Sequence, residues 1–166
     1  MKKFILLIIS TLCIATLCHA QENYWVELTV KDMSGQRKKL SEYANTDNGI
    51  TLFVFWKTCC PNNIRMIDEL QEVWSEYDDV RPIKVVLVSV DDQRSAARVK
   101  PLVKANCWTW EVIMDKNGDL ARAYNVIIPP LWIAVDCNGQ EIYRAKVTNG
   151  TLDASIYFQE LVSQIN

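Results

Sequence analysis

Histidine is almost absent from this sequence of 166 residues, because the single one, His19, lies in an apolar N-terminal segment. That segment opens with Met1-Lys2-Lys3, continues as an apolar run over 4–17 and ends on small residues at Ala20, which is typical of a secretory signal peptide. Cleavage before Gln21 would leave a chain without histidine. Hydrolase triads with a histidine base, histidine-ligated zinc and histidine-ligated haem are then excluded.

An apolar run long enough for a membrane anchor is also lacking, since a spanning helix needs roughly 20 apolar residues. We therefore predict a signal peptide at residues 1–20, one domain at residues 21–166, and export, with the bacterial periplasm as the expected location. No stable membrane span is expected after cleavage. Loss of Lys2 and Lys3 with the signal peptide changes the net charge from −2 to −4. This charge argues against nucleic acid and anionic membranes as partners.

Cysteine is scarce once the signal segment is removed. Of the six cysteines, two fall in that segment, and the predicted mature chain keeps Cys59, Cys60, Cys107 and Cys137. An oxidising compartment permits a disulfide; we interpret Cys107 and Cys137 as ordinary small residues, with a disulfide between them as the minority alternative. The adjacent cysteine pair and the missing Cys-x-x-Cys spacing disfavour zinc. No metal and no cofactor is predicted.

Strand and helix patterns alternate along the rest of the chain. Apolar or alternating runs predict strands at 25–30, 37–40, 50–56, 83–90, 108–114, 131–135 and 140–147. Helical spacing of apolar residues predicts helices at 63–77, at 94–105 with a break at Pro101, at 119–124 and over 152–165. We expect Ser41 to cap a brief helical turn. This order predicts an α/β domain with a mixed central sheet and helices on both faces.

The cysteine pair stands where a buried strand meets a helix. The apolar run 50–56 is followed by Lys57-Thr58-Cys59-Cys60-Pro61, and the helical pattern begins directly afterwards. A helix N-terminus favours thiolate over thiol, so a cysteine at this position is placed to react. The position three residues after Cys60 is Asn63. The strand-Cys-x-x-Cys-helix layout of a dithiol redox enzyme is therefore present without its second sulfur.

Two motifs carry a family resemblance. The segment from Phe55 to Asn63 resembles the F-W-A-x-W-C-P-x-C motif of exported thiol-disulfide oxidoreductases of the TlpA/ResA type, with Cys59 at the usual tryptophan and Asn63 at the second cysteine. The segment 124–136 is similar to Y-G-V-x-G-x-P-x-x-F-L-I-D of the same proteins, which places their cis-proline at Pro130. The resemblance implies a thioredoxin-like three-layer α/β fold, in which helices flank a mixed central sheet.

The resemblance also assigns roles to residues. It implies that Cys60 is the nucleophile, with Cys59 as the neighbouring candidate, and that substrate is contacted by Trp56, Pro61, Pro129 and Pro130. In such proteins the first cysteine attacks a substrate disulfide and the second resolves the mixed disulfide. With Asn63 in the second place, resolution requires an external thiol or reductant. Two departures weaken the catalytic role: Met66 replaces a common glutamate, and Pro129 has no backbone N–H to offer a bound peptide.

Two functional hypotheses remain open. In the first, Cys60 forms mixed disulfides with exported proteins or with small thiols and disulfides. In the second, the domain is a binding or chaperone-like module without redox turnover. A redox pair formed by Cys59 and Cys60 is disfavoured because the ring is strained. A peroxiredoxin is disfavoured because that family places a threonine three residues before its cysteine, whereas Thr58 lies two before Cys60.

Overall fold

A computed structural model of the chain describes residues 28–44, 49–77, 83–146 and 153–164. The signal peptide predicted for residues 1–20 lies outside the described residues. In chain order the elements are β1 (Thr29–Lys31), β2 (Arg37–Lys39), η1 (Leu40–Tyr43), β3 (Ile50–Trp56), α2 (Pro61–Tyr77), β4 (Ile83–Ser89), η2 (Ala96–Arg98), α3 (Val99–Ala105), β5 (Glu111–Met114), α4 (Asp119–Ala123), β6 (Leu131–Val135), β7 (Glu141–Lys146) and α5 (Ala154–Gln164).

The centre of the fold is a five-stranded sheet with the order β5-β4-β3-β6-β7. Strands β3, β4 and β5 pair in parallel, whereas β6 and β7 add antiparallel. The predicted mixed sheet is therefore confirmed. β3 lies in the middle and is buried over Thr51–Trp56, which explains why its sequence is apolar almost throughout.

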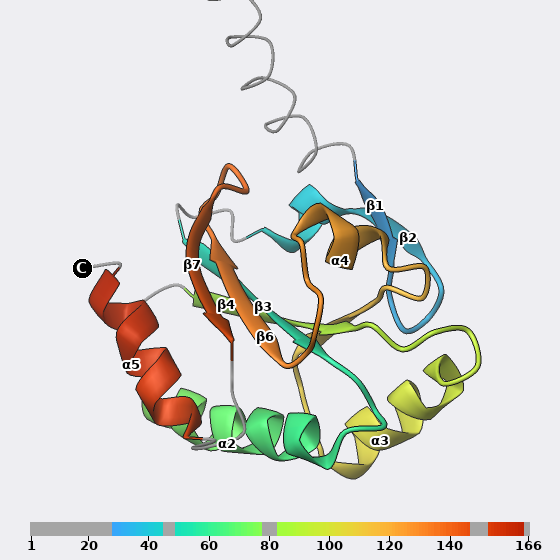
Figure 1. Cartoon of the computed structure of the whole chain (residues 1–166), viewed down its shortest axis with the longest axis horizontal. Helices are drawn as coiled ribbons and strands as arrows, with labels where there is room; N and C mark the ends of the chain where they lie inside the picture. The colour runs from blue at the N-terminus through green and yellow to red at the C-terminus, as the bar shows by residue number, and fades with distance from the viewer. Residues whose placement is uncertain (1–27, 45–48, 78–82, 147–152, 165–166) are drawn as a thin grey trace, which may run out of the picture.

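Both faces of the sheet are covered, which confirms the three-layer α/β fold. Figure 1 shows α2 and α5 below the sheet, with α3 beside α2, and the β1–β2 hairpin with α4 above it. Because side chains of a strand alternate between faces, Leu52, Val54 and Trp56 of β3 join the lower core, whereas Phe53 and Phe55 join the upper one.

Three helix starts differ from the predictions. α2 begins at Pro61 rather than Asn63, because proline fits the first helical position, where its missing N–H costs nothing. The predicted break at Pro101 occurs earlier: η2 ends at Arg98 and α3 restarts at Val99, which leaves the proline in the first turn of the new helix. Ser41 does not cap η1, because that turn already begins at Leu40.

The sheet brings three loops to one edge. β3 and β4 end together, since Trp56 lies opposite Ser89 and the N–H of Val90 donates to the carbonyl of Trp56 over 3.0 Å. β6 starts at the same edge, because Leu131 lies opposite Phe55. The loops that follow β3 and β4 and the loop that precedes β6 therefore meet there. These loops contain the cysteine pair and both residues of Pro129–Pro130.

Candidate functional site

The two adjacent cysteines differ in position and exposure. Cys60 directly precedes α2 and is half-buried, and its carbonyl accepts the N–H of Asn63 at 3.0 Å. Cys59 lies one residue further from the helix, in the turn, and is exposed. Both thiols are free. The structure thus gives Cys60 the place at the positive end of a 17-residue helix and gives Cys59 the greater accessibility.

Asn63 fills the position of the missing second thiol and has a structural role there. Its side chain is completely buried, and its Oδ1 accepts the backbone N–H of Lys57 at 2.9 Å. The amide therefore points back from the first turn of α2 and closes the loop that carries the cysteines. Its Nδ2 is buried with no hydrogen-bond partner in the described structure. The residue holds the loop in shape but supplies no sulfur.

Asp91 fixes the same loop from the other side. This buried carboxylate follows β4 and accepts the N–H of Thr58 at 2.9 Å and its hydroxyl at 2.6 Å. It also accepts the hydroxyl of Ser89 at 2.9 Å. Bonds to a charged acceptor are stronger than neutral ones, so Asp91 is a firm anchor for the turn before Cys59. The predictions included no role for Asp91. The feature of the sequence that could have indicated this role is an acidic residue directly after the strand predicted at 83–90.

Trp56 lies below the site rather than on it. The resemblance implied a substrate contact, but the indole is fully buried and packs edge-to-face on Trp108, with ring centroids 5.2 Å apart. Trp108 is in turn tied to α2, because its Nε1–H donates to the carboxylate of Asp68 at 2.7 Å. Trp56 is therefore part of the core beneath the cysteine loop, and a substrate bound at the surface of that loop does not contact it.

The proline pair stands at the start of β6, beside the end of β3. The peptide bond between Pro129 and Pro130 is cis, at the position that the sequence motif indicated. Both prolines are half-buried, and Pro61 at the start of α2 is exposed. The structure thus brings the cysteine pair, Pro61 and the proline pair to one edge of the fold and leaves all of them at least partly accessible.

Two exposed isoleucines precede the prolines, and the sequence predictions did not include them. Ile127 is 88% exposed and Ile128 is 59% exposed, which makes them the two most exposed large apolar residues among those described. Exposed apolar side chains next to one another at a site edge indicate an interaction surface. The signal in the sequence was an apolar pair directly before Pro129-Pro130, where a loop was expected.

Cys107 and Cys137 take no part in this site. Both are exposed and free, so the disulfide that was considered between them is not formed in the structure. Cys107 follows α3, and Cys137 lies in the turn between β6 and β7. Their interpretation as ordinary residues of loops agrees with these places.

Comparison with known proteins identifies the family. A family model described as AhpC/TSA family matches residues 23–149. The chain belongs to the AhpC/TSA family. Its thioredoxin-like fold is shared with a thioredoxin-like protein of Porphyromonas gingivalis, whose solution structure is 27% identical and aligns with a TM-score of 0.70 over 86% of this chain and 92% of that one.

Curated relatives of this family member include thiol-disulfide oxidoreductases. ResA of Bacillus cereus is 26% identical over 117 residues, which cover 70% of this chain and 64% of the relative. Sporulation thiol-disulfide oxidoreductase A of Bacillus subtilis is 26% identical over 99 residues, 58% of each chain. The chain thus spans less than two thirds of the length of either relative. Similarity to ResA agrees with the resemblance drawn from the two motifs.

Among the residues that the structure describes, no helix is long and apolar enough to cross a membrane.

Proposed function

We propose that this member of the AhpC/TSA family performs thiol-disulfide exchange as an exported protein, through Cys60 as a single nucleophilic cysteine. The observation that carries the proposal is the position of Cys60, a free and half-exposed thiol at the N-terminus of the long helix α2. Helix N-termini carry partial positive charge and unpaired backbone N–H groups, and reactive cysteines are found at such positions. The similarity to ResA and to the sporulation oxidoreductase supports the same chemistry.

The exchange needs only one thiol from this chain. The thiolate of Cys60 attacks one sulfur of a substrate disulfide, the substrate S–S bond breaks, and the released thiolate takes a proton from water. Cys60 is then oxidised to a mixed disulfide. Since position 63 holds a buried asparagine, an external thiol must attack the mixed disulfide to regenerate Cys60. The substrates are exported proteins or small disulfides, and the reductant is an external thiol.

The first test compares the two adjacent cysteines. We expect Cys60→Ser to slow mixed-disulfide formation with insulin about tenfold, because Cys59 lacks the helix N-terminal position. Cys59→Ser is expected to change the rate less than about twofold. The measurement is the amount of trapped adduct on non-reducing gels, with the modified cysteine mapped by mass spectrometry. A larger loss in Cys59→Ser than in Cys60→Ser would overturn the assignment of the nucleophile.

A binding module without turnover is the second candidate function, and one observation favours it. Ile127 and Ile128 are exposed beside the prolines, and Pro129 has no N–H to bind an extended peptide in the usual way. A partner would then be held by apolar contact rather than by strand addition. This module predicts that binding of an apolar polypeptide survives Cys60→Ser.

The exposed isoleucines give a prediction that applies to both functions. Ile127→Asp is expected to lower the rate with insulin about fivefold, because burial of an isoleucine by the partner is lost. The rate with 2-hydroxyethyl disulfide should stay the same, and the free energy of unfolding should change by less than about 0.5 kcal/mol. Ile156→Asp, at an exposed position of α5, is the matched control. Equal losses with both disulfides would show that Ile127 does not contact the polypeptide.

A further inference from the structure

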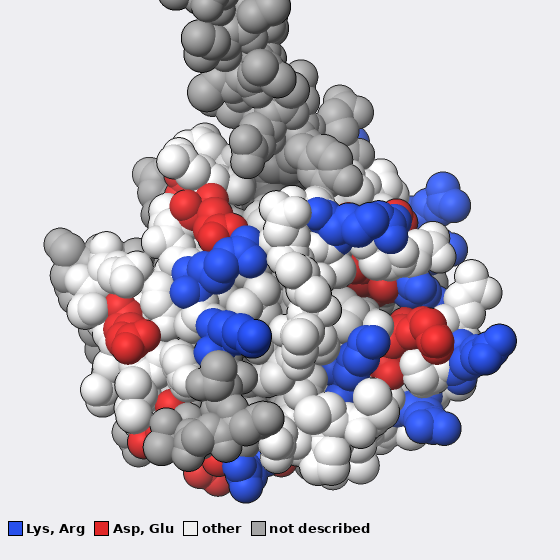
Figure 2. All heavy atoms as spheres, in the orientation of Figure 1, with Lys and Arg blue, Asp and Glu red and all other residues white. Residues whose placement is uncertain are grey.

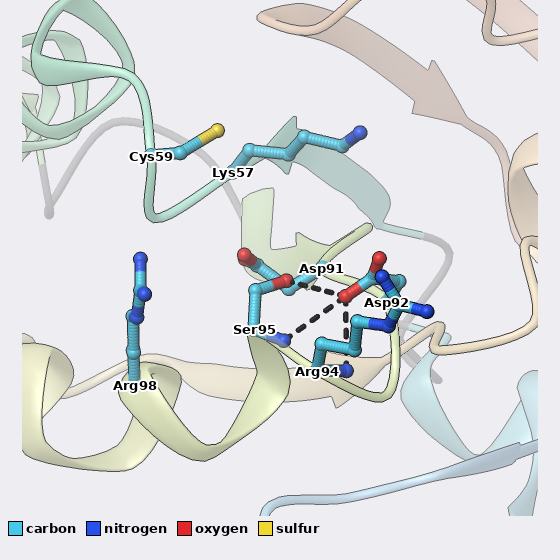
Figure 3. Close-up of a pocket in the computed structure, with 7 residues that line it drawn as sticks. All are labelled: Lys57, Cys59, Asp91, Asp92, Arg94, Ser95 and Arg98. Carbon is cyan, nitrogen blue, oxygen red and sulfur yellow. Dashed lines mark hydrogen bonds between the residues drawn. The ribbon is translucent and has the colours of Figure 1, made fainter.

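A cavity lies beside Cys59, and Cys59 is one of the residues that line it. Its volume is about 280 Å³, slightly below the range of about 300–1,000 Å³ that is usual for sites of small ligands. It lies between the loop after β3, which carries Lys57 and Cys59, and the segment after β4, from which Arg98 extends towards that loop (Figure 3). The lining residues are Lys57, Cys59, Asp91, Asp92, Arg94, Ser95 and Arg98. Cys60 is not among them.

Two of the three cationic side chains of the cavity, those of Lys57 and Arg98, have no anionic partner among the described residues, whereas Arg94 interacts electrostatically with Asp92. The ion pairs and side-chain hydrogen bonds found in the described part of the chain do not include the ammonium of Lys57 or the guanidinium groups of Arg94 and Arg98. Both arginines are exposed and Lys57 is half-buried. Figure 2 shows basic side chains gathered on the side of the molecule that carries α3, around a smaller acidic group. The positive charge of Lys57 and Arg98 is therefore available to a ligand.

The two acidic side chains of the cavity, Asp91 and Asp92, already accept hydrogen bonds from groups of the protein. Asp91 accepts hydrogen bonds from Thr58 and Ser89, as described above. Asp92 accepts the N–H groups of Arg94 and Ser95, and also the hydroxyl of Ser95, each at 3.0 Å. The bonds from Ser95 hold the pKa of Asp92 below its ordinary value, so this carboxylate is charged but internally bound. A ligand thus meets three basic and two acidic side chains, of which Arg94 offsets the charge of Asp92, while Lys57 and Arg98 have no bonded partner among the described residues.

We propose that this cavity binds an acidic disulfide or thiol of low molecular weight and presents its sulfur to Cys59. The anionic groups of the ligand lie against Lys57 and Arg98, which line the same cavity as the thiol, while the size of the cavity excludes a folded protein. This inference rests on the proposed function for the class of reaction, thiol-disulfide exchange, but uses a different cysteine and a different substrate.

The exchange at Cys59 balances as follows. Its thiolate attacks one sulfur of the acidic disulfide and forms a new S–S bond, while the bond within the substrate breaks. Cys59 is oxidised to a mixed disulfide, the released sulfur is reduced, and this thiolate takes a proton from water. A second molecule of the acidic thiol reverses the reaction. The cations speed both directions, because they attract the negative charge of the incoming molecule.

The test uses disulfides of opposite charge on a protein in which Cys59 is the only reactive thiol. In the full chain carrying Cys13→Ser, Cys18→Ser, Cys60→Ser, Cys107→Ser and Cys137→Ser, glutathione disulfide is the anionic probe and cystamine the cationic one. Mass spectrometry gives the rate of adduct formation at Cys59. We expect glutathione disulfide to react about tenfold faster at low ionic strength, and the ratio to fall towards one at about 1 M salt, where charges are screened within about 3 Å.

Charge reversal in the cavity provides the decisive variant. Arg98→Glu is expected to remove or reverse the preference for the anionic probe, whereas Lys104→Glu, the same change at an exposed position of α3 outside the cavity, should leave it intact. Equal rates for the two probes in the parent protein would overturn the proposal. So would a preference that Arg98→Glu does not alter.

The two proposals fail separately. Because Cys60 is serine in this experiment, the result at Cys59 does not depend on whether Cys60 reacts with proteins. If Cys60 does not react with insulin but Cys59 prefers the anionic disulfide, the proposed function is contradicted and the acidic-ligand site is supported. If Cys60 reacts with insulin but Cys59 shows no preference for the anionic disulfide, the proposed function is supported and the acidic-ligand site is contradicted.

Discussion

Replacing Asn63 by cysteine is expected to raise the rate of insulin reduction in the presence of dithiothreitol by roughly two orders of magnitude. The side chain at position 63 points back towards the loop that contains Cys60, as its bond to the N–H of Lys57 shows. A thiol there would attack the mixed disulfide within the same molecule, and intramolecular reactions have effective concentrations far above that of an added thiol. The turbidity of reduced insulin gives the rate.

Asn63→Cys is also expected to lower the stability of the protein, and this loss must be measured separately from the gain in the rate of insulin reduction. Cysteine does not replace the hydrogen bond to Lys57, so the free energy of unfolding should fall by about 1 kcal/mol. Asn63→Ser is the matched control, because it shortens the side chain and adds no thiol. If the serine and cysteine variants reduce insulin equally fast, then the missing second thiol is not what limits this site.

Asp91→Ala is expected to lower the free energy of unfolding by about 3 kcal/mol, because three hydrogen bonds to a buried carboxylate are lost and their donors, on half-buried Thr58 and buried Ser89, lose that partner. Those donors belong to Thr58 and Ser89, so the change also loosens the turn before Cys59. Urea denaturation measures the stability, and the m-value should stay the same if the folded state is otherwise intact.

Asp92→Ala is the control for this experiment. Asp92 is next in the chain and is exposed, and its carboxylate bonds only to the local turn at Arg94 and Ser95. We expect a much smaller change in stability from its loss than from that of Asp91. If the two variants are destabilised equally, the bonds from Thr58 to Asp91 do not anchor the loop.

Much of the fold followed from local patterns. The run 50–56 is apolar at nearly every position, and only a central strand with both faces covered requires that, which is what β3 is. The alternation of strands and helical repeats then led to the mixed sheet. Helix starts were less predictable, since η2 and α3 divide at Arg98 rather than at Pro101. Proline is tolerated in the first turn of a helix, so Pro101 did not mark the boundary.

The candidate site was only partly predictable. The spacing of Cys60, Asn63 and Pro130 pointed to the right edge of the molecule, because strand ends and helix starts are properties of neighbouring residues. The relative exposure of Cys59 and Cys60 was not predictable, since it depends on how the turn is held by Asp91, 31 residues after Cys60 in the sequence. Trp56 was expected to contact substrate and is instead buried against Trp108.

The sequence by itself determined the three-layer α/β architecture, the place of the cysteine pair before α2 and the asparagine at the second position, because each of these depends on local pattern and spacing. Tertiary structure alone decided that Cys59 faces a cavity with Lys57 and Arg98. Those side chains come from segments after two different strands, and the parallel pairing of β3 with β4 is what brings the segments together. Long-range pairing of this kind has no signature in the local sequence.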